Sequence, residues 1–302
     1  MSTTRADDSV ASEGDSLQGF LLALAAYGIW GAMPLYLHQL SHIGMVEVLA
    51  HRVVWSVPVA LAVLVALGRT ADLRRALGSP RLLAMGALTA ALVSFNWGIY
   101  VYTINSGQAI SAALGYYINP LFSILLGAVV LRERLTPLQW AAVALAGAAV
   151  GVLTWEAGRL PLLSLSLTVS WGLYALAKRA LPIGPNQGFT LEVLILFPVA
   201  AGCLLWLASR GDLAFGQTGA RDTLFMLGCG VITAVPLMLY ANGAKKLKLT
   251  TIALMQYIAP SCIFLTAVFI FREPFGQEKL IAFAMIWAAL ALYSADLWWR
   301  RR

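Results

Sequence analysis

Charged residues are scarce in this chain of 302 residues. Asp, Glu, Lys and Arg make up 12% of it, whereas soluble domains carry about 25%. Apolar and aromatic residues reach 60%, which is more than a water-soluble protein of this size buries. A disordered chain is excluded for the same reason, because such chains are polar and charged. The composition therefore predicts a polytopic membrane protein.

Cysteine is also rare, and the short motifs of several enzyme classes are absent. The three cysteines lie within apolar runs at no metal-binding spacing. No G-x-x-x-x-G-K-[ST], H-E-x-x-H or G-x-S-x-G pattern occurs, so the sequence does not indicate a P-loop nucleotide hydrolase or a common zinc or serine hydrolase. We predict no cofactor, no metal site and no enzyme activity. No residue pattern specifies an oligomeric state.

Ten long apolar runs dominate what is present. A bilayer core about 30 Å thick needs roughly 20 apolar residues of helix, and lipid leaves the backbone few alternatives to helix. The predicted fold is therefore all-α and integral to the membrane, with ten transmembrane helices. Their predicted ranges are 17–37, 46–67, 82–104, 109–131, 136–155, 160–180, 188–209, 222–244, 249–271 and 276–299.

Basic residues are distributed unevenly between the two sides of this arrangement. When the N-terminus is placed inside, the inner segments carry fifteen Lys and Arg residues and the outer segments carry five. This asymmetry favours cytoplasmic N- and C-termini and a lipid bilayer as the surrounding partner. Residues 1–16 are polar and acidic, and we expect a disordered cytoplasmic tail there. The basic residues are spread over short loops, which is not typical of nucleic-acid binding.

Two stretches match at a spacing of 140 residues. Leu114-Gly-Tyr-Tyr-Ile-Asn-Pro120 aligns with Leu254-Met-Gln-Tyr-Ile-Ala-Pro260, and Arg132-Glu133 aligns with Arg272-Glu273. Each half holds five predicted helices, an odd number, so the second half enters the membrane from the opposite side. We therefore predict two inverted five-helix repeats, residues 17–155 and 160–299, with a solute site between them near the middle of the membrane.

The matched prolines are candidates for hinges. Pro120 and Pro260 are each the twelfth residue of a predicted span of 23 residues. Proline removes one backbone hydrogen bond and frees a carbonyl group within the membrane. We expect both prolines to bend their helices and to shape a cavity, with a plain structural kink as the alternative.

Aromatic and amide side chains within the predicted spans are candidates for the wall of that cavity. Polar groups in lipid are costly, so they usually face a cavity or another helix. Such a wall suits an organic solute with a flat or apolar part and a polar head, and not a bare inorganic ion. Helix–helix packing and interfacial anchoring are the alternatives. The predicted substrate-binding residues are Trp30, Asn96, Trp97, Tyr100, Tyr117, Asn119, Trp171, Tyr174, Tyr240, Gln256 and Tyr257.

Three ionisable residues near span ends are candidates for gating or coupling. Glu47 and Arg52 open the second span beside His51, and Glu192 aligns with Glu47 in the repeat, near the basic pair Lys178-Arg179. Ion pairs that form on opposite sides of the membrane in turn would make two gates, and static pairing at helix ends is the alternative. The histidine and the carboxylates also leave proton coupling open.

Five blocks of the sequence together carry a family resemblance. They are Ala23-Leu-Ala-Ala-Tyr-Gly-Ile-Trp-Gly31, His51-Arg-Val-Val-Trp-Ser56, Leu114-Gly-Tyr-Tyr-Ile-Asn-Pro-Leu121, Gly230-Val-Ile-Thr-Ala-Val-Pro-Leu237 and Gln256-Tyr-Ile-Ala-Pro260. These blocks resemble the RarD branch of the EamA family, within the drug/metabolite transporter superfamily. The likeness covers about residues 17–299, and it implies ten helices in two inverted EamA repeats and a permease of the bacterial inner membrane. RarD members are commonly labelled chloramphenicol-sensitive proteins, and amino-acid exporters of the YddG type are similar in plan.

These observations together predict a secondary-active permease that works by alternating access. The expected cargo is a small organic metabolite that is exported, either an amino acid or a drug-like amphipathic solute. An integral-membrane enzyme is one alternative, and it would need a cluster of carboxylates, histidines or metal ligands at one interface. A channel or a scaffold without active transport is the other alternative. Single-channel current would indicate a channel, and saturable counterflow would indicate a transporter.

Overall fold

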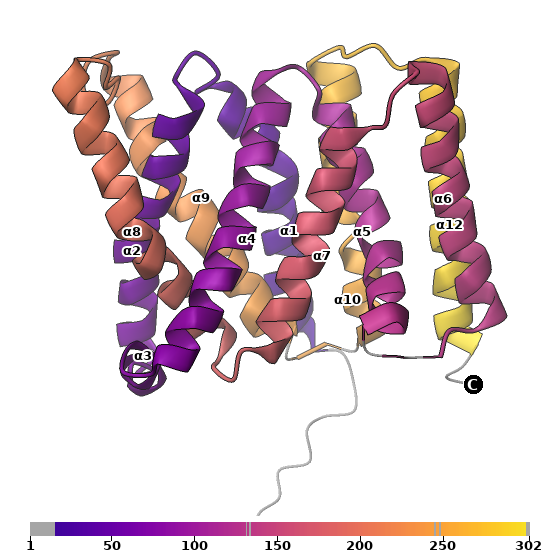
Figure 1. The fold of residues 1–302 in the computed structure, drawn as a ribbon, viewed down its shortest axis with the longest axis horizontal. Helices are drawn as coiled ribbons and strands as arrows, with labels where there is room; N and C mark the ends of the chain where they lie inside the picture. The colour runs from indigo at the N-terminus through magenta and orange to yellow at the C-terminus, as the bar shows by residue number, and fades with distance from the viewer. Residues whose placement is uncertain (1–15, 131, 133, 245, 248, 300–302) are drawn as a thin grey trace, which may run out of the picture.

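The structure is a computed structural model, and it describes residues 16–299 apart from 131, 133, 245 and 248. In Figure 1 the long helices stand side by side between two faces. The lower face carries α3, the start of α1 and the end of α12, and the upper face carries the α1–α2 and α8–α9 connections. The helices of the described chain are α1 (Leu17–His38), α2 (Met45–Ala66), α3 (Ala71–Leu77), α4 (Pro80–Asn105), α5 (Ala109–Val130), α6 (Pro137–Ala157), α7 (Leu162–Ala180), α8 (Pro185–Arg210), α9 (Ala220–Ala244), α10 (Leu249–Met255), α11 (Ile258–Leu265), the π-helical turn η1 (Thr266–Ile270) and α12 (Gln277–Trp299).

Hydropathy and length confirm the prediction of an all-α membrane protein. Among the described residues, eight helices are long and apolar enough to cross a bilayer: α1, α2, α4, α5, α6, α8, α9 and α12. They match eight of the predicted spans to within a few residues. The remaining two predicted spans correspond to α7 and to the α10–α11–η1 segment, which do not meet both criteria, so the count of ten spans stays a prediction.

The span predicted over 249–271 is not one regular helix. The helical pattern breaks at Gln256 and Tyr257, between α10 and α11, and the segment ends in a π-helical turn. Pro260 has no amide hydrogen, so it cannot donate to the carbonyl group of Gln256, four residues earlier. By contrast, α5 continues through Pro120 without a break. The two prolines therefore do not produce matching breaks, and the one break lies just before Pro260 rather than at it.

Two details lie outside the predicted spans. The short helix α3 lies between the second and third predicted spans, and it buries Leu73 and Ala76. Ser16 does not belong to the predicted tail, because its hydroxyl oxygen accepts a hydrogen bond from the Gly19 amide at 3.0 Å and caps α1. Residues 1–15 and Glu133 lie outside the described residues.

Close packing of the central helices encloses the interior. α1 packs against α9 and α11, α2 against α8 and α9, and α7 against α4 and α5, while α6 and α12 pair beside this group at the right of Figure 1. Glycine permits the closest approaches: a Cβ atom at Gly230 of α9 would overlap the backbone of Trp55 in α2, and one at Gly115 of α5 would lie 2.7 Å from the Ser164 carbonyl oxygen in α7. These contacts position the residues that surround a central cavity.

Candidate functional site

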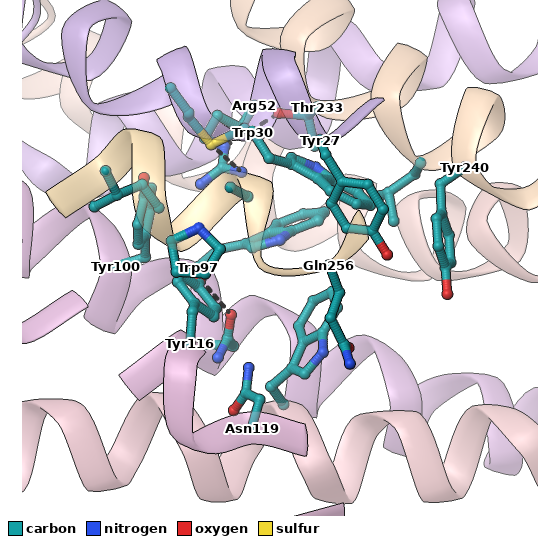
Figure 2. Close-up of a pocket in the computed structure, with 17 residues that line it drawn as sticks. Tyr27, Trp30, Arg52, Trp97, Tyr100, Tyr116, Asn119, Thr233, Tyr240 and Gln256 are labelled. Carbon is teal, nitrogen blue, oxygen red and sulfur yellow. Dashed lines mark hydrogen bonds between the residues drawn. The ribbon is translucent and has the colours of Figure 1, made fainter. Parts of the chain in front are cut away.

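A cavity of about 160 Å³ lies among the central helices, and Figure 2 shows its wall. An engineered protein cavity of roughly 150 Å³ holds one benzene molecule, so this space suits a solute with about one aromatic ring. The wall comes from seven parts of the chain, α1, α2, α4, α5, α7, α9 and the α10–α11 segment. The residues that line the cavity are Tyr27, Trp30, Met33, Arg52, Asn96, Trp97, Tyr100, Tyr116, Asn119, Trp171, Thr233, Leu237, Tyr240, Gln256, Ala259, Pro260 and Ile263.

Eight of the eleven residues predicted to bind substrate lie on this wall, although their role in binding stays a prediction. Several also hold the wall together: the Asn96 amide donates to the Leu167 carbonyl oxygen at 3.1 Å and to the Ser170 hydroxyl at 2.9 Å, which joins α4 to α7. The eight are Trp30, Asn96, Trp97, Tyr100, Asn119, Trp171, Tyr240 and Gln256.

The other three predicted residues are not among the lining residues. The Tyr117 hydroxyl lies 2.6 Å from the Ser261 hydroxyl, and its ring packs on Phe283 of α12. Tyr174 donates to a Glu192 carboxylate oxygen at 3.2 Å. Tyr257 packs against the large apolar core that residues of most of the long helices form. All three therefore serve contacts between helices, which was the alternative assigned to such residues.

Sequence analysis did not select several lining residues, most clearly Tyr27 and Tyr116. Tyr27 shares a helix face with Trp30, three residues later, and this spacing was the available signal. Tyr116 precedes Tyr117, and one residue rotates the side chain by about 100° around a helix. The repeat alignment favoured Tyr117, whereas the packing of α5 turns Tyr116 toward the cavity.

An aromatic cluster forms the end of the cavity opposite Tyr100 in Figure 2. The ring centroids of Tyr27, Trp30 and Tyr240 lie 5.5–5.7 Å apart, in edge-to-face and tilted arrangements. Such rings present apolar surface and π faces at low conformational cost. Gln256, at the break between α10 and α11, places an amide beside this cluster.

Arg52 lies in the cavity wall, and the structure does not pair it with Glu47. Arg52 is 1% exposed. Its Nε atom donates a hydrogen bond to the Thr233 hydroxyl at 3.1 Å, and its guanidinium carbon lies 4.8 Å from the centroid of the Trp97 ring. Its Nη1 atom has no hydrogen-bond partner among the described residues. A charge at the centre of a membrane helix costs about 2.5–3.5 kcal/mol on insertion scales, so a buried cation of this kind is a functional candidate.

Glu47 joins α2 to the connection between α8 and α9 at the upper face. Its buried carboxylate accepts hydrogen bonds from the backbone amides of Ala214 at 3.0 Å and Phe215 at 2.8 Å. His51 Nε2 lies 3.7 Å from the same carboxylate, while its Nδ1 faces the indole Nε1 of Trp55 at 3.0 Å. Because the indole only donates, His51 Nδ1 is the acceptor, and the proton of a neutral His51 ring lies on Nε2, toward Glu47.

Glu192 forms a buried ion pair near the lower face. Its carboxylate lies 2.5 Å from the Lys178 ammonium group, and the carboxylate side chain is fully buried while that of Lys178 is 20% exposed. Arg179, the other basic candidate, is exposed. The prediction that Glu192 lies close to Lys178 is therefore confirmed in position, and its role as a gate stays a prediction.

Helices long and apolar enough to cross a bilayer, packed around a solute-sized aromatic cavity, are typical of a membrane transporter. The chain belongs to the EamA-like transporter family, whose pattern matches residues 17–155. An uncharacterized transporter of Vibrio cholerae is 41% identical over 93% of both chains. Protein RarD of Streptomyces exfoliatus is 40% identical over 94% of this chain and 90% of its own length, and protein RarD of Escherichia coli is 36% identical over 94% and 96%. A solved crystal structure shares the fold over 91% of this chain and 96% of its own, with a TM-score of 0.61 and 20% identity.

Proposed function

We propose that this transporter is a secondary-active permease of the bacterial plasma membrane that exports a small organic metabolite by alternating access. The observation that carries the proposal is the aromatic cavity between residues 17–155 and 160–299, which is lined by both halves of the chain. Its size and its mixture of rings and amides suit an amino acid or a small amphipathic solute. The positive-inside asymmetry favours a cytoplasmic lower face, where α1 starts and α12 ends.

Two structural parallels support an inverted repeat. Arg132 and Arg272, which are 140 residues apart, have φ angles of 57° and 54°, and they are the non-glycine residues of the described chain with positive φ. The helix contacts are also equivalent in the two halves. α1 packs on α9 and α11, while α7, the repeat partner of α1, packs on α4 and α5, which are the repeat partners of α9 and α11. An unusual backbone conformation at matching positions is expected when both halves share one fold.

Contacts at the upper face support a gate on that side. Glu47 from the first half binds amides of Ala214 and Phe215 in the second, and Glu273 from the second half accepts from the amides of Ala109 and Ile110 at 2.5 and 2.9 Å. These two carboxylates join the halves where α2 and α5 begin. Alternating access requires such contacts to break when the upper face opens.

Counterflow tests the proposed transport. Purified protein in liposomes loaded with an unlabelled aromatic amino acid or amphipathic drug is expected to accumulate the labelled solute from outside in a saturable manner. Trp97→Ala, which removes a cavity wall, is expected to lower this counterflow at least 10-fold, whereas Trp140→Ala, an exposed position on α6, leaves it unchanged. Counterflow that is equal in both variants, or single-channel current in place of saturation, contradicts the proposal.

Cysteine labelling tests the inverted repeat independently. Cys203, Cys229 and Cys262 are replaced by alanine, and a single cysteine is placed at Arg132 or Arg272, both of which are exposed. A maleimide that cannot cross the membrane is expected to label Arg272→Cys from the periplasmic side and Arg132→Cys only after permeabilisation. Labelling of both positions from one side rejects the repeat.

A further inference from the structure

We propose that the cavity selects a small organic monoanion, and that its carboxylate pairs with Arg52. This inference rests on the proposed function, because it takes the central cavity as the solute site. It goes further in assigning the charge of the solute and the group that recognises it.

The position of Arg52 carries the inference. The side chain is buried within the bundle, and it makes no ion pair with an acidic residue of the described chain. Buried charges in proteins are usually paired or bind a ligand. Here the unpaired cation lies on the wall of a cavity, so a bound anion is the partner that the arrangement lacks.

The contacts of the guanidinium group leave its Nη1 atom without a hydrogen-bond partner among the described residues. Thr233 occupies Nε, Nη2 lies 4.0 Å from the Met33 sulfur, and the Trp97 ring covers one face of the group. Figure 2 shows Thr233 and Trp97 beside the Arg52 side chain, and these contacts restrict the plane of the guanidinium group. A planar fork held in this way is suited to carboxylate recognition.

Other buried polar atoms of the cavity wall also lack partners. The Tyr100 hydroxyl makes no hydrogen bond within the described chain, nor does the Asn119 Oδ1 atom. Unpaired buried polar groups are uncommon in native proteins, and here they belong to lining residues. We infer that Tyr100 donates a second hydrogen bond to the anionic group and that Asn119 accepts one from a polar substituent on the solute.

The charge of the wall narrows the class of solute. Arg52 is the cation among the described lining residues, and no aspartate or glutamate lies among them. A cationic solute would meet an uncompensated like charge in a medium of low dielectric constant. One positive charge also balances a monoanion and not a phosphate dianion. The aromatic cluster of Tyr27, Trp30 and Tyr240 then receives the apolar part of the acid.

Calorimetric titration of the purified full-length protein tests this assignment with three probes of one shape. Phenylacetate is the anion, phenylacetamide its neutral counterpart and phenethylamine the cation. We expect wild-type protein to bind phenylacetate at least 10-fold more tightly than either of the others. This comparison requires no variant, so it stands even where a substitution impairs folding.

Variants then assign the preference to Arg52. Arg52→Gln is expected to reduce the affinity for phenylacetate at least 10-fold, to that for phenylacetamide, and to leave the amide unchanged. Arg52→Lys keeps the charge and is expected to retain part of the preference. Arg81→Gln, an exposed arginine at the start of α4, is the matched control and is expected to change nothing.

The outcomes separate this inference from the proposed function. Equal binding of acid and amide by the wild type, with both weakened by Trp97→Ala, overturns the anion assignment and leaves the cavity as the solute site. An acid preference that Arg52→Gln does not alter also overturns it. Phenylacetate binding that Trp97→Ala does not weaken contradicts the cavity itself, and absence of phenylacetate binding to the wild type overturns the present inference.

Discussion

Two cations inside this transporter, the half-buried Lys178 and the buried Arg52, have opposite surroundings. Lys178 lies 2.5 Å from the Glu192 carboxylate and is not among the residues that line the cavity, and the pair joins α7 to α8. Arg52 lies on the cavity wall with a hydroxyl, a sulfur atom and an aromatic face around it, and no carboxylate of the described chain pairs with it. A charge whose partner is in the chain stabilises the fold, whereas a charge without one is available to a ligand.

The largest effect is expected when the internal ion pair is cut. Lys178→Met leaves the fully buried Glu192 carboxylate without its counter-ion, which typically costs about 3–5 kcal/mol. Equilibrium unfolding in mixed detergent measures the loss of free energy. The neighbouring Arg179→Met, at an exposed position, is expected to change stability by less than about 0.5 kcal/mol. Equal effects of the two substitutions would show that the pair does not hold α7 to α8.

A smaller loss is expected at the upper face. Glu47→Ala removes the carboxylate that accepts hydrogen bonds from the amides of Ala214 and Phe215. Both residues are only half-buried, so water can replace the lost acceptor, and the expected loss for the two bonds together is about 1.5–3 kcal/mol. Hydrogen exchange of these two amides is expected to accelerate together with the loss of stability. Unchanged exchange at residues 214 and 215 contradicts the assignment of Glu47 as the tie between the halves.

Arg52 is expected to respond in the opposite direction to Lys178. Arg52→Met removes an unpaired buried charge and keeps most of the apolar side chain. The free energy of unfolding of the ligand-free protein is therefore expected to rise by roughly 1–2 kcal/mol or to stay unchanged. The same unfolding measurement applies. A loss as large as that of Lys178→Met would show that Arg52 is held for stability rather than for a ligand.

The smallest expected effects compare two tyrosines at matching positions of the proposed repeats. Tyr117→Phe removes the hydrogen bond to Ser261 and is expected to cost about 0.5–1.5 kcal/mol. The Tyr257 hydroxyl makes no hydrogen bond within the described chain, so Tyr257→Phe is expected to be neutral to within about 0.5 kcal/mol. A larger loss of stability for Tyr257→Phe than for Tyr117→Phe would contradict this assignment, because it would show that the Tyr257 hydroxyl makes the stronger hydrogen bond.

The chemistry of the cavity could be predicted from the sequence better than its shape. Polar and aromatic residues in apolar spans pointed to eight lining residues, because such groups seldom face lipid. The choice of Tyr117 over Tyr116 failed, since neighbouring residues point to different sides of a helix and only the packing of α5 on α7 decides which side faces inward. The bend expected at Pro260 is a break at Gln256 and Tyr257, because a proline removes the hydrogen bond to the carbonyl group four residues earlier and its effect falls on the preceding turn.

The sequence by itself determined the membrane location and most of the helices, since lipid forces each long apolar run to satisfy its backbone within the same segment. Only the tertiary structure decided which buried charges are paired. Glu47 and Arg52 lie close in sequence, yet one binds the α8–α9 connection and the other faces the cavity beside Thr233 of α9. Pairing depends on which neighbouring helix each side chain meets, and that is a property of the packed bundle rather than of any one segment.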